Sequence, residues 1–180
     1  MKIAITGAHR VGKTTLAEKL QESFTDYELR KEPYYELEEL GYLFSEVPEV
    51  TDFIEQLEYS IKQISTAGDN VIFDRCPFDF LAYMKAIDES GNIQSLFSEA
   101  ERVMSKIDLL VLIPIEEPDL ISCPESDLPE LRQRVNEILI DWKSDFGIET
   151  IEVKGTLSNR LDQVLAKISQ DFGKIVTRDA

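Results

Sequence analysis

The feature that most constrains this chain is a stretch of eight residues near its N-terminus, Gly7-Ala8-His9-Arg10-Val11-Gly12-Lys13-Thr14. The stretch matches the phosphate-loop motif GxxxxGK[ST]. An apolar run, Ile3–Thr6, precedes it, and an amphipathic helical pattern, Thr15–Phe24, follows it, as the motif requires. In such a loop the glycines let the backbone approach a phosphate, and the N–H groups and the helix start hold the anion. The sequence therefore predicts a nucleoside triphosphate site over residues 7–15, ending at Thr15.

Two side chains of the motif have expected roles in phosphoryl transfer. Lys13 is predicted to reach the β- and γ-phosphates, and the Thr14 hydroxyl is positioned to ligate Mg²⁺. We therefore expect ATP and Mg²⁺ as cofactors. His9 and Arg10 occupy free positions of the motif, so Arg10 could contact a phosphate or project into solvent.

Apolar runs alternate with helical patterns along the whole chain. The runs predict strands over Ile3–Thr6, Tyr27–Lys31, Asn70–Asp74, Asp108–Ile113 and Ile148–Val153. Helices are predicted over Thr15–Phe24, Tyr35–Leu43, Thr51–Thr66 with Thr51 as its N-cap, Pro77–Asp88, Ile93–Ile107, Glu130–Asp145 and Leu157–Phe172. Strands separated by helices indicate an α/β fold with a parallel sheet that is covered on both faces. We expect one domain over residues 1–174, followed by a flexible tail at 175–180.

The charge and composition exclude several classes of function. The net charge is −16, from 35 acidic and 19 basic residues, so a nucleic acid would be repelled, whereas local cations can still hold a small anion. No apolar run is long enough to span a membrane and no signal peptide is recognisable, so a cytoplasmic location is expected. One His and two distant cysteines, Cys76 and Cys123, predict neither a zinc site nor a structural disulfide. The oligomeric state is not indicated.

Polar residues follow two of the predicted strands, at the edge of a parallel sheet where ligands gather. These residues are Glu32, after the second strand, and Asp74 and Arg75, at the end of the third. Glu32 or Asp74 could orient an acceptor hydroxyl and take its proton, Asp74 could also hold Mg²⁺, and Arg75 could stabilise the acceptor or the transferring group. Alternatively, Asp74 and Arg75 form only a structural ion pair, and Asp79 only orients Arg75 or caps its helix.

The segment 114–134 is a candidate lid over the triphosphate. Its first part, Pro114–Pro129, holds four prolines and is predicted to be a loop, and Arg132 and Arg134 follow it. A closing lid would exclude water and bring one of these arginines to the transition-state charge, although both could instead face solvent. Aromatic residues between the second and third strands could cover the acceptor or pack in the core: Tyr34, Tyr35, Tyr42, Phe44, Phe53 and Tyr59.

Two absences favour transfer to an acceptor over hydrolysis. No Asn-Lys-x-Asp motif follows the fourth predicted strand, so the guanine-recognition signature of regulatory GTPases is missing. Asp74 is followed by Arg75, not by the glutamate that polarises water in most mechanical ATPases.

The combined motifs resemble a known family. Four segments carry the resemblance: Gly7–Thr14, Glu32-Pro33, Asp74-Arg75-Cys76-Pro77-x-Asp79 followed by Leu81-Ala82-Tyr83, and Val153-Lys154-Gly155 with Arg160-Leu161. In these segments the chain resembles the ribosylnicotinamide-kinase-like (NadR-type) AAA ATPase-like P-loop proteins and, more distantly, deoxynucleoside and thymidylate kinases. The resemblance covers roughly residues 1–172. It implies a three-layer P-loop NTPase fold with strand order 2-3-1-4-5, Mg·ATP as donor and an arginine-bearing lid. It also implies Glu32 as a candidate for the base, Asp74 and Arg75 on the acceptor and metal side, and Arg132 or Arg134 as lid arginines.

The sequence thus favours a kinase that transfers the γ-phosphoryl group of ATP to a small, hydroxyl-bearing, nucleoside-like acceptor. A regulatory or switch ATPase that hydrolyses ATP slowly and acts through a partner is the alternative. Transfer to the end of a nucleic acid is a third possibility, which the charge of −16 disfavours.

Overall fold

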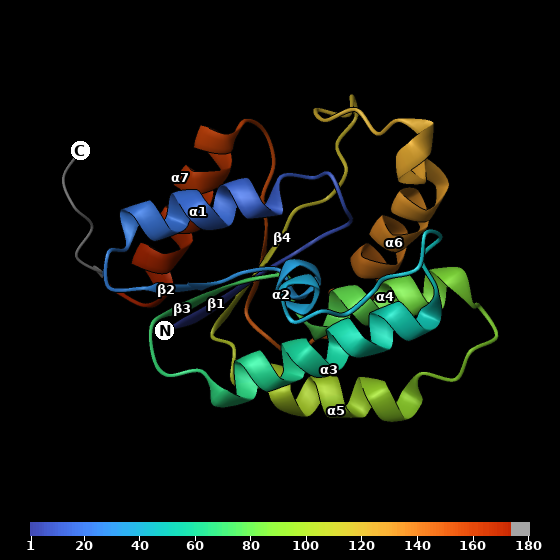
Figure 1. The fold of residues 1–180 in the computed structure, drawn as a ribbon. Coiled ribbons are helices and arrows are strands. Elements are labelled where there is room, and N and C mark those ends of the chain that lie inside the picture. Colours follow the sequence, from blue (N-terminus) through green and yellow to red (C-terminus); the bar gives the residue numbers. More distant parts are fainter. Residues whose placement is uncertain (174–180) are drawn as a thin grey trace.

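A computed structural model describes residues 1–173 and shows five parallel strands at the centre of the molecule (Figure 1). The strands are β1 (Lys2–Thr6), β2 (Glu28–Arg30), β3 (Val71–Asp74), β4 (Leu109–Leu112) and β5 (Thr150–Glu152). Their order is β2-β3-β1-β4-β5, and all neighbours pair in parallel, which confirms the predicted fold. Residue 174 and the predicted tail lie outside the described residues.

The composition of the three central strands explains their position. Every residue of β3 and β4 is buried, and only Lys2 of β1 is partly exposed. Strands rich in Ile, Val and Leu without polar alternation must be covered on both faces. The edge strands β2 and β5 are short and only half-buried, consistent with their place at the margins of the sheet.

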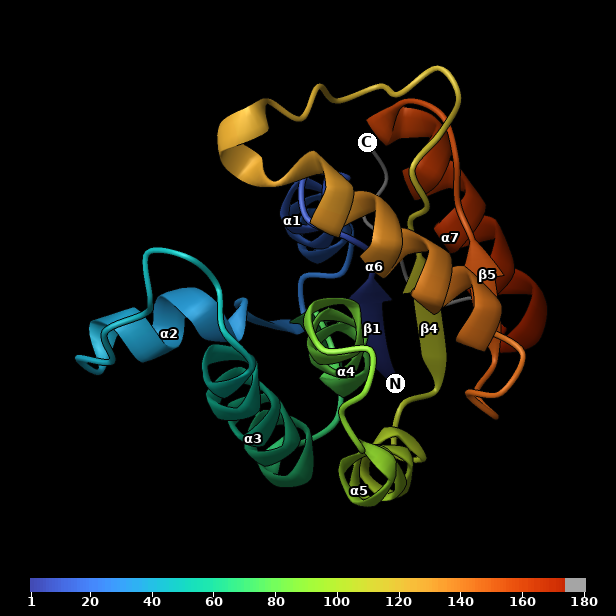
Figure 2. The same ribbon diagram turned by 90° about the vertical axis from the view of Figure 1, so that its right-hand side faces the viewer.

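Helices cover both faces of the sheet and form the two outer layers (Figures 1 and 2). Helices α1 (Lys13–Ser23) and α7 (Leu157–Asp171) pack together on one face. The other face carries α3 (Val50–Thr66), α4 (Pro77–Ile87) and α5 (Gln94–Met104), while α2 (Pro33–Glu39) packs on α3 and α6 (Pro129–Trp142) packs on α4. Helix α4 lies between α3 and α6 and is buried on nearly all sides, as its almost wholly apolar sequence requires.

Three of the predicted boundaries are wrong for local reasons. Thr51 is not the N-cap of α3, because the helix begins one residue earlier and Glu49 forms a capping box with Asp52. The predicted helix Tyr35–Leu43 instead begins at Pro33 and ends at Glu39, with Gly41 in the left-handed region at φ 92° just beyond it. Helix α6 ends at Trp142, three residues before the predicted end, and the predicted loop contains a single 3₁₀ turn, Glu125–Asp127.

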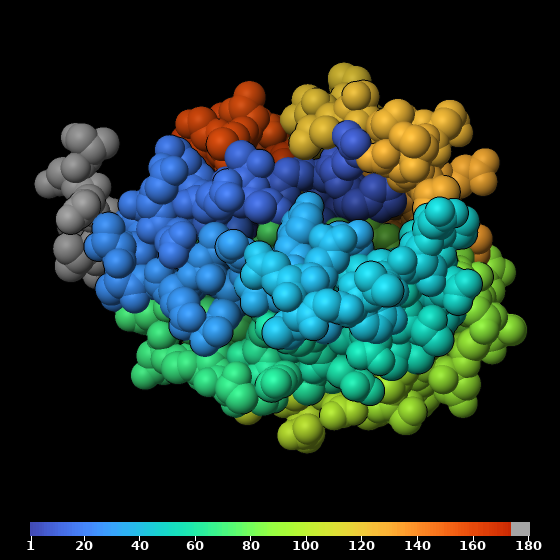
Figure 3. All heavy atoms as spheres, viewed as in Figure 1, coloured from blue at the N-terminus to red at the C-terminus, as the bar shows by residue number. Residues whose placement is uncertain are grey.

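The fold brings several loops together at the carboxyl edge of the sheet. Chain segments after β1, β2 and β3 meet the segment after β4 there, and Figure 3 shows a hollow between them, bordered by the blue, cyan and yellow parts of the chain. None of the helices in residues 1–173 is long and apolar enough to cross a membrane.

Candidate functional site

The phosphate loop connects β1 to α1, and its two glycines are required by the backbone. Gly7 has φ 148°, and a Cβ at this position would lie 2.5 Å from the carbonyl oxygen of Ile113. Gly12 has φ 89° and directly precedes α1, where a Cβ would approach the guanidinium of Arg160 to 3.2 Å. Side chains larger than hydrogen would therefore push β4 or Arg160 away from the loop. The predicted loop residues 7–14 and Thr15 lie together around the start of α1, where the helix dipole favours an anion.

Asp79 fixes the loop from the neighbouring helix. One carboxylate oxygen accepts a 2.9 Å hydrogen bond from the Gly7 N–H, and the other accepts a 2.8 Å bond from the Cys76 N–H at the start of α4. Asp79 is fully buried. The bond from Cys76 caps α4, as one of the sequence alternatives supposed. The bond from Gly7 holds the start of the phosphate loop, a role that sequence reasoning missed because the two residues lie 72 positions apart.

Lys13 lies almost completely buried within the loop. Its ammonium group donates a 2.6 Å hydrogen bond to the carbonyl of Ala8. Burial, followed by the positive charge of Arg75, lowers the pKa of Lys13 from 10.5 to about 8. An anion bound in the loop would favour the charged form again, so this pKa makes Lys13 a sensitive reporter of phosphate binding.

Thr14 and Asp74 meet at the predicted metal position. The Thr14 hydroxyl donates a 2.6 Å hydrogen bond to Oδ2 of Asp74, while Oδ1 of Asp74 is buried with no hydrogen-bond partner in the described chain. Burial raises the pKa of Asp74. Residues 1–173 contain no cluster of three or more His, Cys, Asp or Glu side chains able to hold a metal. A hydroxyl with one carboxylate nevertheless fits Mg²⁺, which takes few protein ligands beside phosphates and water.

Arg75 pairs with Glu32, not with Asp74 as the structural alternative supposed. Its Nε donates to Oε1 of Glu32 at 2.5 Å, and the guanidinium lies 5.5 Å from the ring centroid of Tyr83. Arg75 is 8% exposed, and its Nη1 has no hydrogen-bond partner within residues 1–173. Its backbone has φ 81°, an uncommon conformation for a residue with a side chain, directly after β3. The structure thus brings Glu32, Asp74 and Arg75 to the same edge.

His9 links the loop to α4 and to the segment 114–134. Its backbone N–H donates to the Tyr83 hydroxyl at 2.8 Å, and Nδ1 lies 2.8 Å from the same hydroxyl. Nε2 lies 2.6 Å from the carbonyl oxygen of Asp127. That carbonyl can only accept, so Nε2 carries the proton and Nδ1 accepts from Tyr83. Burial is the main cause that lowers the pKa of His9 from 6.5 to about 4, which keeps the ring neutral at pH 7.

The structure separates the two arginines that the sequence left equivalent. Arg132 is 4% exposed, and its guanidinium donates to the carbonyls of His9 at 2.9 Å and Arg10 at 3.1 Å. Nη1 of Arg132 also donates a hydrogen bond to Oδ2 of Asp119 at 2.5 Å. Arg134 is exposed, pairs with Glu89 and is not brought to the phosphate loop.

A further arginine, which sequence reasoning did not assign to the site, also holds the loop. Arg160 of α7 donates from Nη1 to the carbonyl of Val11 at 2.5 Å and from Nη2 to Glu116 at 2.9 Å. Glu116 in turn accepts the N–H of Gly155 at 2.9 Å. Arg10, by contrast, is exposed and pairs with Asp127.

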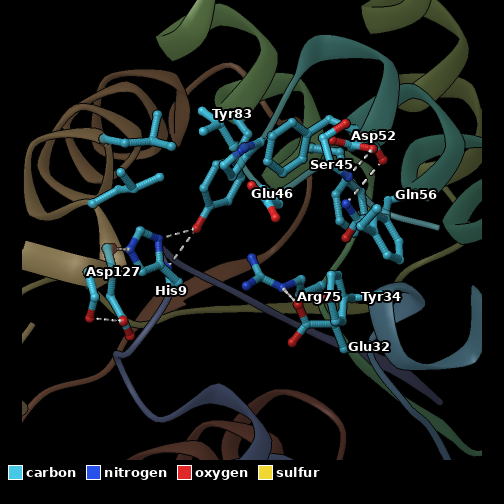
Figure 4. Close-up of a pocket in the computed structure, with 18 residues that line it drawn as sticks. His9, Glu32, Tyr34, Ser45, Glu46, Asp52, Gln56, Arg75, Tyr83 and Asp127 are labelled. Carbon is cyan, nitrogen blue, oxygen red and sulfur yellow. Dashed lines mark hydrogen bonds and ion pairs between the residues drawn. The ribbon is translucent and has the colours of Figure 1, made fainter. Parts of the chain in front are cut away.

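A cavity of 480 Å³ opens beside the phosphate loop (Figure 4). Glu32 and Arg75 lie at one wall, and His9 and Tyr83 face each other at another. The other lining residues come from the α2–α3 region, α4, the 3₁₀ turn Glu125–Asp127 and the start of α6: Tyr34, Phe44, Ser45, Glu46, Val47, Pro48, Asp52, Phe53, Gln56, Phe80, Ser126, Asp127, Leu128 and Leu131. Of the aromatic residues that could cover the acceptor or pack in the core, Tyr34, Phe44 and Phe53 line the cavity, while Tyr35 is exposed.

Comparison with known proteins places the chain in a family. The profile of the AAA domain family matches residues 2–160. The chain belongs to this family. No curated protein sequence matches it significantly.

Solved structures of P-loop kinases share the fold at low sequence identity. The NadR protein in complex with NR superposes with a TM-score of 0.70 at 17% identity, covering 99% of this chain and 53% of NadR, so the chain spans about half the length of that protein. Deoxyadenosine kinase from M. mycoides gives a TM-score of 0.67 at 19% identity, covering 94% and 99% of the two chains. Thymidylate kinase from Candida albicans gives 0.68 at 17% identity, covering 98% and 96%. The predicted P-loop kinase-like resemblance is confirmed.

Proposed function

We propose that this protein is an ATP-dependent kinase that transfers the γ-phosphoryl group of Mg·ATP to a hydroxyl of a small, nucleoside-like molecule. The observation that carries the proposal is the 480 Å³ cavity that meets the phosphate loop at His9 and contains Glu32 and Arg75. Its volume is typical of a small-molecule site. A switch or hydrolase needs only water beside the γ-phosphate, whereas a kinase needs room for a second substrate.

Several groups would hold the donor. The loop amides and Lys13 would bind the phosphates. Arg132 and Arg160 stabilise the loop by donating hydrogen bonds to its carbonyls. A second hollow of 170 Å³ lies between Gly12 and Gly155, at the start of α1. Its lining is mainly apolar, so it suits the nucleoside part of ATP.

Glu32 and Arg75 would act on the acceptor. Glu32 would orient the acceptor hydroxyl and take its proton. Nη1 of Arg75, which has no hydrogen-bond partner within residues 1–173, would donate to the acceptor or to the transferring phosphoryl. Thr14 and Asp74 would hold Mg²⁺, which supplies charge neutralisation on the triphosphate when bound. The NadR structure contains NR and the deoxyadenosine kinase structure contains dCMP, so related folds accommodate nucleoside-like molecules.

Three variants test this assignment, with kinetics and melting temperature measured in parallel. Glu32→Gln is expected to lower kcat at least about 10²-fold while leaving ATP affinity nearly unchanged, because the amide cannot take a proton. Arg75→Ala is expected to raise the KM for the acceptor, and Asp74→Asn to raise the Mg²⁺ concentration required. Glu39→Gln, an exposed change on α2, is the matched control and should behave as wild type.

The opposite pattern would refute the roles. If Glu32→Gln and Arg75→Ala lower the melting temperature but leave turnover per folded molecule intact, the pair is structural only. The regulatory ATPase alternative is supported instead if ADP forms at the same rate with and without any acceptor.

A further inference from the structure

The connection from α2 to α3 presents a group of apolar side chains to solvent. Within residues 1–173 nine large apolar side chains are exposed, and four of them fall between residues 35 and 47: Tyr35, Leu40, Leu43 and Val47. Leu43 is 90% exposed and Leu40 is 72% exposed. Single exposed apolar side chains are common on protein surfaces, whereas several from one short stretch are typical of an interaction surface. We call these four residues the apolar patch.

Packing of the neighbouring residues keeps the leucines of the patch on the outside. The N–H of Tyr42 donates to the carbonyl of Leu37 at 2.9 Å, and the ring of Phe44 stacks on Tyr34 with centroids 4.2 Å apart. Tyr42 and Phe44 are half-buried, whereas Leu43 between them is exposed. Figure 2 shows α2 and this connection projecting from the body of the molecule. The patch is therefore a fixed feature of the surface that the fold itself does not cover.

The charge around the apolar patch has one sign only. Residues 32–61 contain nine acidic residues and no Lys or Arg, so this stretch contributes −9 to the net charge of −16. Within residues 1–173 only one of the nine, Glu32, forms an ion pair. Six of them are exposed: Glu38, Glu39, Glu46, Glu49, Glu55 and Glu58. An apolar surface flanked by unbalanced carboxylates is complementary to a partner that is both apolar and basic.

A second copy of this chain does not supply that chemistry. A two-fold contact through the apolar patch would set the same carboxylates against one another, and like charges across an interface are unfavourable. Cations elsewhere in residues 1–173 are largely paired with carboxylates of their own chain: Arg10, Lys19, Arg30, Arg102, Arg134, Lys143, Lys154 and Lys167. The charge therefore favours a different protein as the partner.

The backbone of the connection indicates how the partner is bound. Residues 40–49 form no strand, so they offer no sheet edge to which a partner could add a strand, and recognition must come from side chains. We propose that the apolar patch docks a basic amphipathic helix of another protein, whose apolar stripe covers Leu40 and Leu43 and whose Lys and Arg side chains face the surrounding carboxylates.

This interaction surface is separate from the proposed catalytic groups. Leu40 and Leu43 do not line the 480 Å³ cavity, whereas Glu46 and Val47 do. A docked helix would therefore lie beside the cavity without using Glu32 or the phosphate loop, and the proposal does not depend on the kinase function.

Three synthetic peptides test the charge and the apolar stripe separately. Each is about 15 residues long, a length at which an isolated helix can form, and carries a fluorophore for anisotropy titration of the full chain. The first has a leucine stripe and lysines, the second the same stripe with glutamates, and the third an alanine stripe with lysines. We expect the leucine–lysine peptide to bind at one per protein, the leucine–glutamate peptide not to bind, and the alanine–lysine peptide to bind at least about tenfold more weakly than the first.

Paired substitutions locate the binding surface. Leu40→Ser with Leu43→Ser removes two exposed apolar side chains, so the melting temperature should not change while the leucine–lysine peptide binds at least about tenfold more weakly. Ile87→Ser with Phe172→Ser removes two exposed apolar side chains elsewhere and is the control, which should leave peptide affinity unchanged.

A second pair tests the carboxylates. Glu38→Gln with Glu39→Gln should weaken the same peptide several-fold at low salt, and the difference from wild type should vanish at about 1 M salt, where charges are screened. Glu18→Gln with Asp162→Asn changes the net charge by the same amount at exposed positions on α1 and α7, and should have little effect.

The proposal is overturned if the leucine–lysine peptide does not bind, if several copies bind per protein, or if Leu40→Ser with Leu43→Ser leaves its affinity unchanged. Equal losses in the two charge-matched pairs would show attraction to the net charge alone and would also reject it. Sedimentation identifies the other occupant: a wild-type dimer that Leu40→Ser with Leu43→Ser dissociates would assign the apolar patch to a second copy of the chain. No assay here uses ATP or an acceptor, so these outcomes are independent of whether the protein transfers phosphate.

Discussion

The buried ammonium of Lys13 predicts that ATP binding weakens in mild alkali. The pKa of Lys13 is lowered to about 8 in the free protein, mainly by burial, and bound phosphates should raise it again. The charged form binds the triphosphate, so affinity is nearly complete at pH 7, is halved near pH 8 and falls further as pH rises. ATP binding should accordingly take up protons in this range.

The size of the effect follows from the two protonation states. With a pKa near 8, about nine-tenths of the protein has a charged Lys13 at pH 7 and about one-tenth at pH 9. The affinity for Mg·ATP should therefore fall about tenfold between these values, with proton uptake rising from about 0.1 to about 0.9 per ATP bound. His9, with a pKa near 4, does not titrate in this window.

Calorimetry in two buffers of different ionisation enthalpy measures both quantities. Lys13→Arg is the informative variant, because a guanidinium keeps its charge throughout this range and should bind ATP with no slope between pH 7 and 9. Lys13→Ala should bind weakly at both values. An affinity that does not change with pH in the wild type, or a slope that persists in Lys13→Arg, would refute the reasoning.

Three further predictions concern stability. The lowered pKa of His9 means that the unfolded chain binds a proton more readily than the folded protein, so the free energy of unfolding should fall as pH drops from 6.5 towards 4. Denaturant unfolding at pH 7.5 and 5 measures this fall, and the fall should be about 1 kcal/mol smaller in His9→Gln. Arg132→Ala should lower the free energy of unfolding by about 2–4 kcal/mol and weaken ATP binding, because it leaves buried loop carbonyls without a hydrogen-bond donor. Arg134→Ala should change neither quantity appreciably, and equal effects of the two variants would contradict this assignment. Neither a reductant nor a zinc chelator should change the melting temperature, since Cys76 and Cys123 are both free thiols; a large drop with either reagent would be inconsistent with the fold.

The phosphate loop and the central strands could be predicted because their signals are local, whereas the strand order was implied only by the family resemblance. The loop is defined by spacing within one strand-loop-helix unit, and the central strands by uninterrupted apolar runs. Helix ends were predicted less well. Thr51 is a better N-cap than Glu49 by preference alone, yet the chain turns into α3 after Pro48, so Glu49 occupies the cap.

The supports of the loop could not be predicted, because each joins distant parts of the chain. Asp79 reaches Gly7 across 72 positions, and Arg160 reaches Val11 across 149. Arg132 and Arg134 could have been separated: Arg132 lies on the stripe of α6 that continues through Val135 and Leu139, whereas Arg134 lies off it. The pairing of Arg75 with Glu32 also depends on tertiary structure, since β2 and β3 must first lie side by side.

One measurement tests the central claim most directly: the stoichiometry of ADP and phosphorylated product when the protein is incubated with Mg·ATP and a panel of ribosides. The two products can be counted together by ³¹P NMR and mass spectrometry. The account predicts that ADP forms only when an acceptor is present, with one phosphorylated acceptor for each ADP. Steady ADP formation that no riboside stimulates, with inorganic phosphate as the other product, would contradict it.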